Sequence, residues 1–223
     1  MINTSLNIKN TKKLLSKKIF LFSICIVIFL HSNAQNADSK KFNFRGYSGG
    51  MMLHTGYLYS GKMNINAQKI IIQGFPTGIG GAMRFHFGKN FRVGGEGYAS
   101  TLSYGEKNNS YISLGWGGLL VDYHWQINKF SIFFGGTLGG GGIKNVTVTN
   151  TAINSIKENA IYQKYSIMIV DPFVGMEYGF TQRMSVTAKI DWILNISEKR
   201  TDLPTGARVY LGFSFFHSKN TKK

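Results

Sequence analysis

The stretch Met184-Ser-Val-Thr-Ala-Lys-Ile-Asp-Trp-Ile-Leu194 decides the fold. Apolar side chains alternate in it with polar or charged ones, which is the period of a β-strand and not that of a helix. Ile190 therefore falls on one face of the strand, and its neighbours Lys189 and Asp191 fall on the other. Such a strand needs apolar surroundings on one side and polar surroundings on the other.

The same two-residue period recurs along the chain, with aromatic and branched residues on one face and small or charged residues on the other. Together with 184–194, the expected strands are 47–59, 77–88, 91–104, 111–126, 130–142, 165–180 and 207–217. The apolar phase switches within 111–126, where Gly117-Gly118 indicates a bulge. Pro172 lies inside 165–180 and cannot donate to a hydrogen-bond ladder.

The connections between these strands alternate in length. Three are tight and four are longer, which places both chain ends on the short-turn side. The short ones are 88–90, 127–129 and 181–183, and the long ones are 61–76, 105–110, 144–163 and 195–206. Short periplasmic turns and longer outer loops are typical of outer-membrane barrels. The predicted fold class is all-β, an eight-stranded antiparallel up-and-down transmembrane β-barrel in a Gram-negative envelope.

Composition agrees with a barrel. The 223 residues include 27 glycines, and 14% are aromatic, with only three prolines. Disordered chains are poor in aromatics, collagen needs a strict glycine period, and long helices do not tolerate this glycine content. A narrow barrel needs glycine, because its sheet bends sharply and its long side chains need room.

The N-terminus is typical of a signal peptide. Five lysines precede the apolar run 19–30, and small residues lead up to a cleavage site between Ala34 and Gln35. Twelve apolar residues are too few for a transmembrane helix. Lipidation at Cys25 is disfavoured, because Ile24 precedes it and the apolar run continues. The expected parts are a signal peptide 1–34, a short segment 35–41, a barrel 42–217 and a basic tail 218–223.

Charged residues on the polar strand faces are expected to fill the lumen. An eight-stranded barrel leaves an interior just wide enough for side chains. Four bases and five acids nearly balance, so we predict a packed network of ion pairs and not a pore lining. The alternative is the solvent-facing side of a soluble sandwich. The predicted network comprises Arg84, Arg92, Glu96, Asp122, Asp171, Glu177, Lys189, Asp191 and Arg208.

The remaining charge is strongly basic and falls on turns, loops and tails. The whole chain carries 26 Lys and Arg against ten Asp and Glu. A basic surplus that flanks a membrane is expected to contact anionic lipid head groups. Basic proteins also bind nucleic acid, but an exported chain would not meet it.

The sequence offers no complete motif for catalysis, cofactor binding or metal binding. His54, His86 and His124 are expected to hydrogen-bond in the lumen. A small barrel that modifies lipid would instead bring His, Ser and an acid together near the outer leaflet. Trp116, Trp125 and Trp192 are expected as interface anchors, and Tyr104 belongs to the expected outer aromatic girdle. No enzyme activity, cofactor or metal is expected.

The last strand, Arg208-Val-Tyr-Leu-Gly-Phe-Ser-Phe-Phe216, has a central glycine followed by alternating aromatics. With the signal peptide and the alternating strands, it resembles the terminal signal of small outer-membrane β-barrel proteins, similar to outer membrane proteins A and X. The resemblance covers 42–217 and implies recognition of the last strand by the barrel-assembly machinery. Many such chains end on the aromatic itself, whereas a basic tail follows here.

These features predict an integral outer-membrane protein with a filled lumen and a structural or surface-interaction role. Tight turns offer little surface, so the outer loops 61–76 and 144–163 are the expected contact regions for a surface ligand. They either present strand edges to a partner or only lengthen the barrel wall. A narrow porin-like transporter of a small solute or hydrophobic ligand is the main alternative, and a lipid-modifying enzyme is the other.

Overall fold

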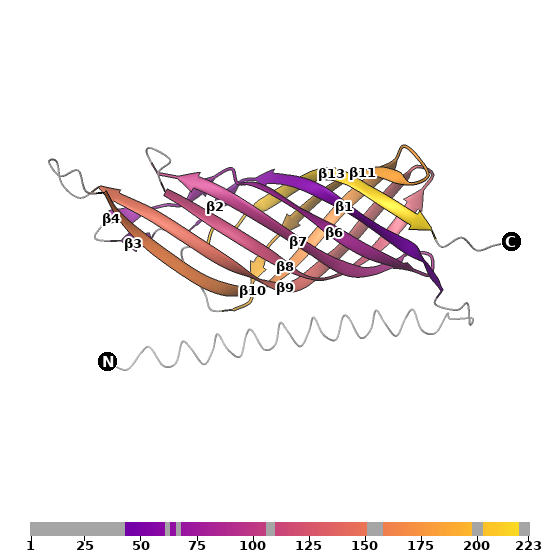
Figure 1. Ribbon diagram of the computed structural model, residues 1–223, viewed down its shortest axis with the longest axis horizontal. Helices are drawn as coiled ribbons and strands as arrows, with labels where there is room; N and C mark the ends of the chain where they lie inside the picture. The colour runs from indigo at the N-terminus through magenta and orange to yellow at the C-terminus, as the bar shows by residue number, and fades with distance from the viewer. Residues whose placement is uncertain are drawn as a thin grey trace, which may run out of the picture. The chain divides into compact units, whose positions relative to one another are not determined.

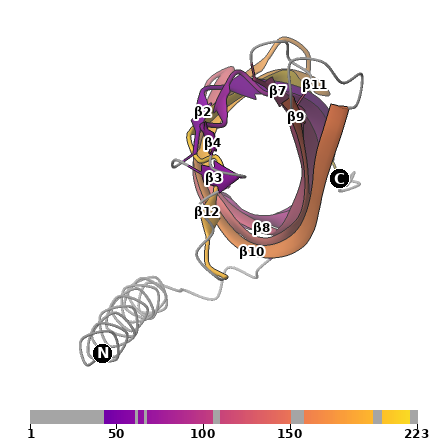
Figure 2. The same cartoon turned by 90° about the vertical axis from the view of Figure 1, so that its left-hand side faces the viewer.

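The computed structural model describes residues 43–60, 63–65, 68–105, 110–150, 158–197 and 203–218. Eight long strands surround a common axis (Figures 1 and 2). They are β1 (Phe44–Gly56), β6 (Thr77–Phe87), β7 (Phe91–Tyr104), β8 (Ser110–Ile127), β9 (Phe130–Asn150), β10 (Glu158–Gly179), β11 (Met184–Trp192) and β13 (Ala207–Ser218). The expected signal-peptide cleavage between Ala34 and Gln35 and the end of the basic tail lie outside the described residues.

The eight strands form a closed antiparallel ring. Neighbours in the ring are neighbours along the chain, β1 pairs with the last strand β13, and β10 pairs with β11 to close the circle. The two-residue strand β12 (Leu194–Asn195) continues the line of β11 along β10. Closure leaves every strand paired on both sides at its middle, which is the condition for a sheet to cross lipid. The predicted eight-stranded barrel is confirmed.

The tight turns lie at one end of the ring and the longer connections at the other (Figure 1). Gly88 and Asn128 occupy two of the three tight turns with φ near +58° and +56°, a region that glycine and asparagine tolerate best. At the long-loop end, the segment after β1 forms short pairs. These are β2 (Leu58–Tyr59) with β5 (Gln73–Gly74), and β3 (Met63–Ile65) with β4 (Gln68–Ile70).

Large apolar side chains cover the outside of the ring. Met51, Leu119, Trp125 and Leu211 are each more than 60% exposed, and the outward residues of the long strands follow the predicted alternation except in the first half of β8. The inward positions are buried and include most of the strand charges. A protein in water would have the opposite arrangement, so the outer face is built for lipid.

The bulge predicted at Gly117-Gly118 is wrong. Strand β8 keeps one register with β7 and with β9 through both glycines, and its even-numbered residues face inward throughout. The apparent change of phase arises because the lumen-facing side of β8 is itself apolar around Ile112 and Trp116. The irregularity of the sheet lies elsewhere, between Phe44 and Gly46 in the β1–β6 pair.

Strands β9 and β10 are longer than predicted. Most of the expected loop 144–163 is strand, because β9 runs to Asn150 and β10 starts at Glu158 in one unbroken ladder. Pro172 lies inside β10, as the sequence indicates. It falls between the residues that pair with β11, from Phe173 onward, and those that pair with β12, up to Val170. Its missing N–H is therefore tolerated.

Glycine makes room for rings in the lumen. A Cβ at Gly175 would collide with the Phe133 ring and with the carbonyl of Ala188, and a Cβ at Gly80 would collide with Tyr98. These close approaches explain part of the high glycine content, since a narrow barrel can hold large inward side chains only beside positions without one.

Candidate functional site

The structure places all nine residues of the predicted charge network inside the barrel. Eight of their side chains are at most 2% exposed, and that of Glu177 is 15% exposed. They form two groups, one toward the short-turn end and one near the middle of the lumen. Buried charges need partners, because an isolated ion in a low-dielectric interior is strongly unfavourable.

The group toward the short-turn end is built on Asp122, which comes from β8. Its two carboxylate oxygens accept hydrogen bonds from Arg84 Nε at 2.8 Å and Arg92 Nε at 2.5 Å. Arg92 also donates through Nη1 to both oxygens of Glu177 at 3.1 Å. Both guanidinium groups lie over the ring of Phe133, 5.4 and 5.0 Å from its centroid. One carboxylate thus holds two arginines from neighbouring strands.

The central group joins Lys189 and Arg208 to three acids. Lys189 Nζ donates to Glu96 Oε2 at 3.0 Å and lies 3.4 Å from Asp191. Arg208 Nε donates to Asp191 Oδ1 at 2.9 Å, and its Nη2 lies 3.4 Å from Asp171. The pairs link β7, β10, β11 and β13 across the lumen, so the network braces the barrel from inside.

Aromatic rings surround this central group. Lys189 Nζ lies between 4.4 and 5.7 Å from the ring centroids of Tyr98, Tyr210, Phe173 and Trp116. The cation–π attraction of such rings adds to the ion pairs. Trp116 was predicted as an interface anchor, and that prediction is wrong, because its side chain faces the lumen and is 5% exposed. Trp125 and Trp192 do lie on the outer surface.

The lumen toward the long-loop end is apolar, which the sequence reading missed. Its members come from the ring strands and from the segments just beyond them, and they are almost fully buried. They are Leu58, Ile72, Leu102, Ile112, Ile143, Ile167, Ile169, Ile193 and Leu203. The signal in the sequence is the row of isoleucines at inward positions of β8, β9 and β10. This half of the lumen is packed like the core of a soluble β-protein.

Tyr104 closes this apolar region and is not part of the outer girdle, contrary to the prediction. Its side chain is 3% exposed, and its hydroxyl lies 2.6 Å from Asn145 Oδ1 and 2.6 Å from Thr147 Oγ1. A phenol buried among apolar groups needs such partners. Its inward position follows from its even number in β7, where the inward residues are even throughout.

The lumen histidines lie in two places. His54 packs on Tyr98 and Tyr210 near the middle of the lumen. His86 Nε2 and Ser48 Oγ share a hydrogen bond of 2.8 Å, and His86 lies edge-on to His124. Within the described residues no carboxylate hydrogen-bonds to His86, so the Ser-His pair lacks the acid of a catalytic triad.

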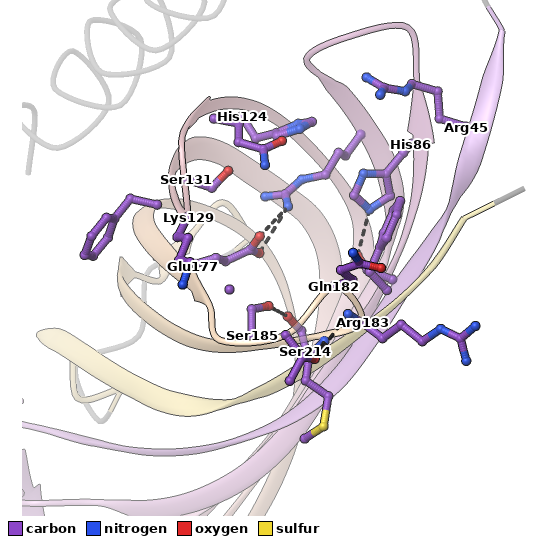
Figure 3. Close-up of a pocket in the computed structure, with 18 of the residues that line it drawn as sticks. Arg45, His86, His124, Lys129, Ser131, Glu177, Gln182, Arg183, Ser185 and Ser214 are labelled. Carbon is purple, nitrogen blue, oxygen red and sulfur yellow. Dashed lines mark hydrogen bonds and ion pairs between the residues drawn. The ribbon is translucent and has the colours of Figure 1, made fainter.

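A cavity of about 270 Å³ opens at the short-turn end of the lumen (Figure 3). Its inner wall includes Arg92 and Glu177, and its side walls carry the hydroxyl groups of Ser131, Ser185 and Ser214. Arg45, Lys89, Lys129 and Arg183 stand around its opening. In the described part of the chain, no group of three or more His, Cys, Asp or Glu side chains is placed to hold a metal ion.

The closed ring, its apolar outer face and its paired interior charges define a small transmembrane β-barrel with a filled lumen. Within the described ranges, no helix is long and apolar enough to span a bilayer. No model of a known protein family matches the chain, and no curated protein sequence matches it.

Solved structures with this architecture are bacterial outer-membrane barrels. Neisserial surface protein A is similar over 79% of this chain and 99% of its own, with a TM-score of 0.50 and 9% identity. The attachment invasion locus protein Ail of Yersinia pestis is similar over 77% of this chain and 99% of its own, with a TM-score of 0.47 and 13% identity. The N-terminal barrel domain of Pseudomonas aeruginosa OprF is similar over 78% of this chain and 100% of its own, with a TM-score of 0.45 and 12% identity. The likeness to Neisserial surface protein A, at 9% identity, concerns the fold alone.

Proposed function

We propose that this chain is a non-enzymatic, integral protein of the outer membrane, whose lumen is closed by its own side chains and whose outer segments make surface contacts. The observation that carries the proposal is the content of the lumen. Paired charges fill its middle, and packed isoleucines and leucines fill its outer half. A pathway for a hydrated solute would need a continuous polar channel, as the larger porins have.

Conductance tests the closed lumen. We expect the folded protein in planar bilayers to give no steady unit conductance, because the cavity at the short-turn end stops at the Arg92–Glu177 pair. A large porin inserted in the same bilayers serves as the positive control. Band shifts between unboiled and boiled samples on gels would show that the inserted protein is folded. Steady channels of uniform size from the wild-type protein would favour the transporter instead.

The outer segment best placed for contacts is the hairpin of β9 and β10. Strand β8 pairs with β9 only as far as the Tyr111–Val146 pair, and β10 pairs with β12 only as far as Ile169. Among the residues that the structure describes, the hairpin beyond these points has one ladder, between its own two strands. Free strand edges can accept a partner strand, which supports a role in surface recognition.

Shortening this hairpin tests that role. Val146 and Tyr162 are register partners, so residues 147–161 can be replaced by Asn-Gly, which forms a tight hairpin turn. We expect the shortened protein to fold, as judged by the heat-dependent gel shift. We expect the adherence of expressing cells, to one another and to coated surfaces, to fall to the level of cells without the gene. In the matched control, Asn-Gly replaces the turn of the β3–β4 hairpin instead. If the shortened β9–β10 chain does not assemble, the hairpin is structural.

A further inference from the structure

The cavity at the short-turn end is strongly basic. Five basic side chains contribute to its wall or its opening, against one acid, Glu177. Glu177 is already engaged, because both of its oxygens accept from Arg92 Nη1 at 3.1 Å. The four bases at the opening lie on exposed turns and strand ends, at Arg45, Lys89, Lys129 and Arg183. The cavity therefore has a surplus of positive charge, and four of its five bases are exposed.

One hydrogen-bond donor of Arg92, which belongs to this wall, is buried without an acceptor. Arg92 is 1% exposed, and its Nε and Nη1 are bonded, but its Nη2 is buried without a hydrogen-bond partner. Such unpaired donors are rare in folded proteins and call for an acceptor. The hydroxyl groups of Ser131, Ser185 and Ser214 line the same cavity; those of Ser185 and Ser214 hydrogen-bond to each other at 2.6 Å, so Ser131 and one of that pair can donate to a ligand. An oxyanion held here would meet hydroxyl groups and the cations of the opening, with the buried charge of Arg92 behind the wall, and such groups are the usual partners of phosphate.

A second hollow continues this site onto the outside of the barrel. It is lined by Arg45, Lys89, Asn90, Tyr123, Trp125, Gln126 and Asn128. Arg45, Lys89 and Gln126 line both hollows. Tyr123 and Trp125 are 38% and 66% exposed on the lipid-facing side. The path from the cavity thus leads past two cations to an aromatic surface at the membrane boundary, where aromatic side chains favour lipid head groups.

We propose that this mouth binds the phosphate group of an anionic phospholipid from the adjacent leaflet, with the apolar part of the lipid against Tyr123 and Trp125. The phosphate lies between Arg45 and Lys89 and reaches toward Arg92 and the serine hydroxyls. Tight turns face the periplasm in such barrels, so this leaflet is the inner one of the outer membrane. The site is independent of the outer hairpin and goes beyond the function proposed above.

Size and position favour a lipid over other anions. A cavity of about 270 Å³ is below the range of roughly 300–1,000 Å³ of pockets that enclose drug-sized ligands, so it suits one small head group. A soluble phosphate compound shares the oxyanion chemistry but gains nothing from the aromatic side of the second hollow. The lipid therefore uses both hollows, and the soluble compound uses one.

Native mass spectrometry of the folded protein in non-ionic detergent tests the proposal, with phosphatidylglycerol and phosphatidylcholine as competing probes. We expect phosphatidylglycerol to be retained in preference. The double variant Arg45→Gln/Lys89→Gln should bind it about thirty-fold more weakly, since each basic side chain near an anionic head group contributes about five-fold. Lys144→Gln/Lys164→Gln is the matched control. It removes two exposed lysines that are register partners on β9 and β10, outside both hollows. It should bind as the wild type does.

A second measurement separates the lipid from a soluble phosphate. Glycerol 3-phosphate is titrated into the labelled protein, and amide shifts at Ser131 and Ser185 are followed by NMR. Trp125→Ala should weaken phosphatidylglycerol binding and leave the glycerol 3-phosphate shifts unchanged. Saturable shifts with glycerol 3-phosphate but no preference for phosphatidylglycerol would overturn the lipid assignment. The site itself would be overturned if the Lys144/Lys164 control weakened phosphatidylglycerol binding equally. It would also be overturned if the protein showed neither a preference for phosphatidylglycerol nor amide shifts with glycerol 3-phosphate.

Discussion

Asp122→Asn is expected to lower the free energy of unfolding by about 3–5 kcal/mol, the cost of breaking a buried ion pair by removing one partner. The carboxylate has no exposed surface and accepts from both Arg84 Nε and Arg92 Nε. An amide of the same shape removes the charge and leaves two guanidinium groups buried against one remaining acid, Glu177. The loss should therefore fall at the upper end of that range.

Urea unfolding from lipid vesicles, followed by tryptophan fluorescence, measures this change. Glu177→Gln is the control, because that side chain is 15% exposed and pairs with Arg92 at 3.1 Å. Water reaches it, so its loss should cost about 1 kcal/mol. The double variant Asp122→Asn/Arg84→Met removes the stranded charge as well and should recover part of the stability. Equal losses at Asp122 and Glu177, or no recovery in the double variant, would show that the arginines are not held in this way.

The ring of strands was predictable because the two-residue period leaves little freedom. The segment 91–104 was predicted to the residue, and Arg92, Glu96 and Tyr98 fall on its inward side as the alternation requires. Once one face of each strand is apolar and large, a shift by one residue would turn every charge into lipid. The tight turns were equally readable, because Gly88 and Asn128 suit the left-handed backbone found there.

The outer half of the lumen was not predictable from the same pattern. Alternation indicates two faces but not the surroundings of each, and along β8 and β9 both faces carry apolar residues. Ile112, Trp116 and Ile143 point inward, and Leu119 and Leu138 point outward. The sequence reading assigned Ile112 and Trp116 to the lipid side and therefore required a bulge. Contacts across the ring determine the inward side, such as those of Lys189 and Arg208 with the ring of Trp116, and they join residues of different strands.

The partners of the buried charges could likewise not be predicted from the sequence. The period predicts which charges face inward, but the partners are chosen by the relative heights of the strands. Lys189 finds Glu96, which is 93 residues away in the sequence, across the lumen. The register of each strand pair fixes those heights, and the register depends on every connection in between.

Ile190→Arg is the second large effect that we expect, with a loss of about 2–4 kcal/mol. Ile190 is 50% exposed on the outside of β11, between Val174 of β10 and Val209 of β13, in the middle of the apolar band. A guanidinium group there would have to leave water for hydrocarbon. In a soluble sandwich the same face would be the buried one and Lys189 would be exposed, whereas here Lys189 is 1% exposed.

Unfolding in urea from vesicles measures this loss, and Ser166→Arg is the matched control. Ser166 is also exposed on the outer face, but it lies on β10 beyond Met168, next to Lys164 and toward the long-loop end. Charge near the interface costs only about 0–1 kcal/mol. The difference between the two variants therefore reports depth in the bilayer and not the general effect of adding an arginine to a strand. If both arginines cost the same, the apolar band does not lie in lipid at the height of Ile190, and the membrane-spanning assignment of β11 would have to be abandoned.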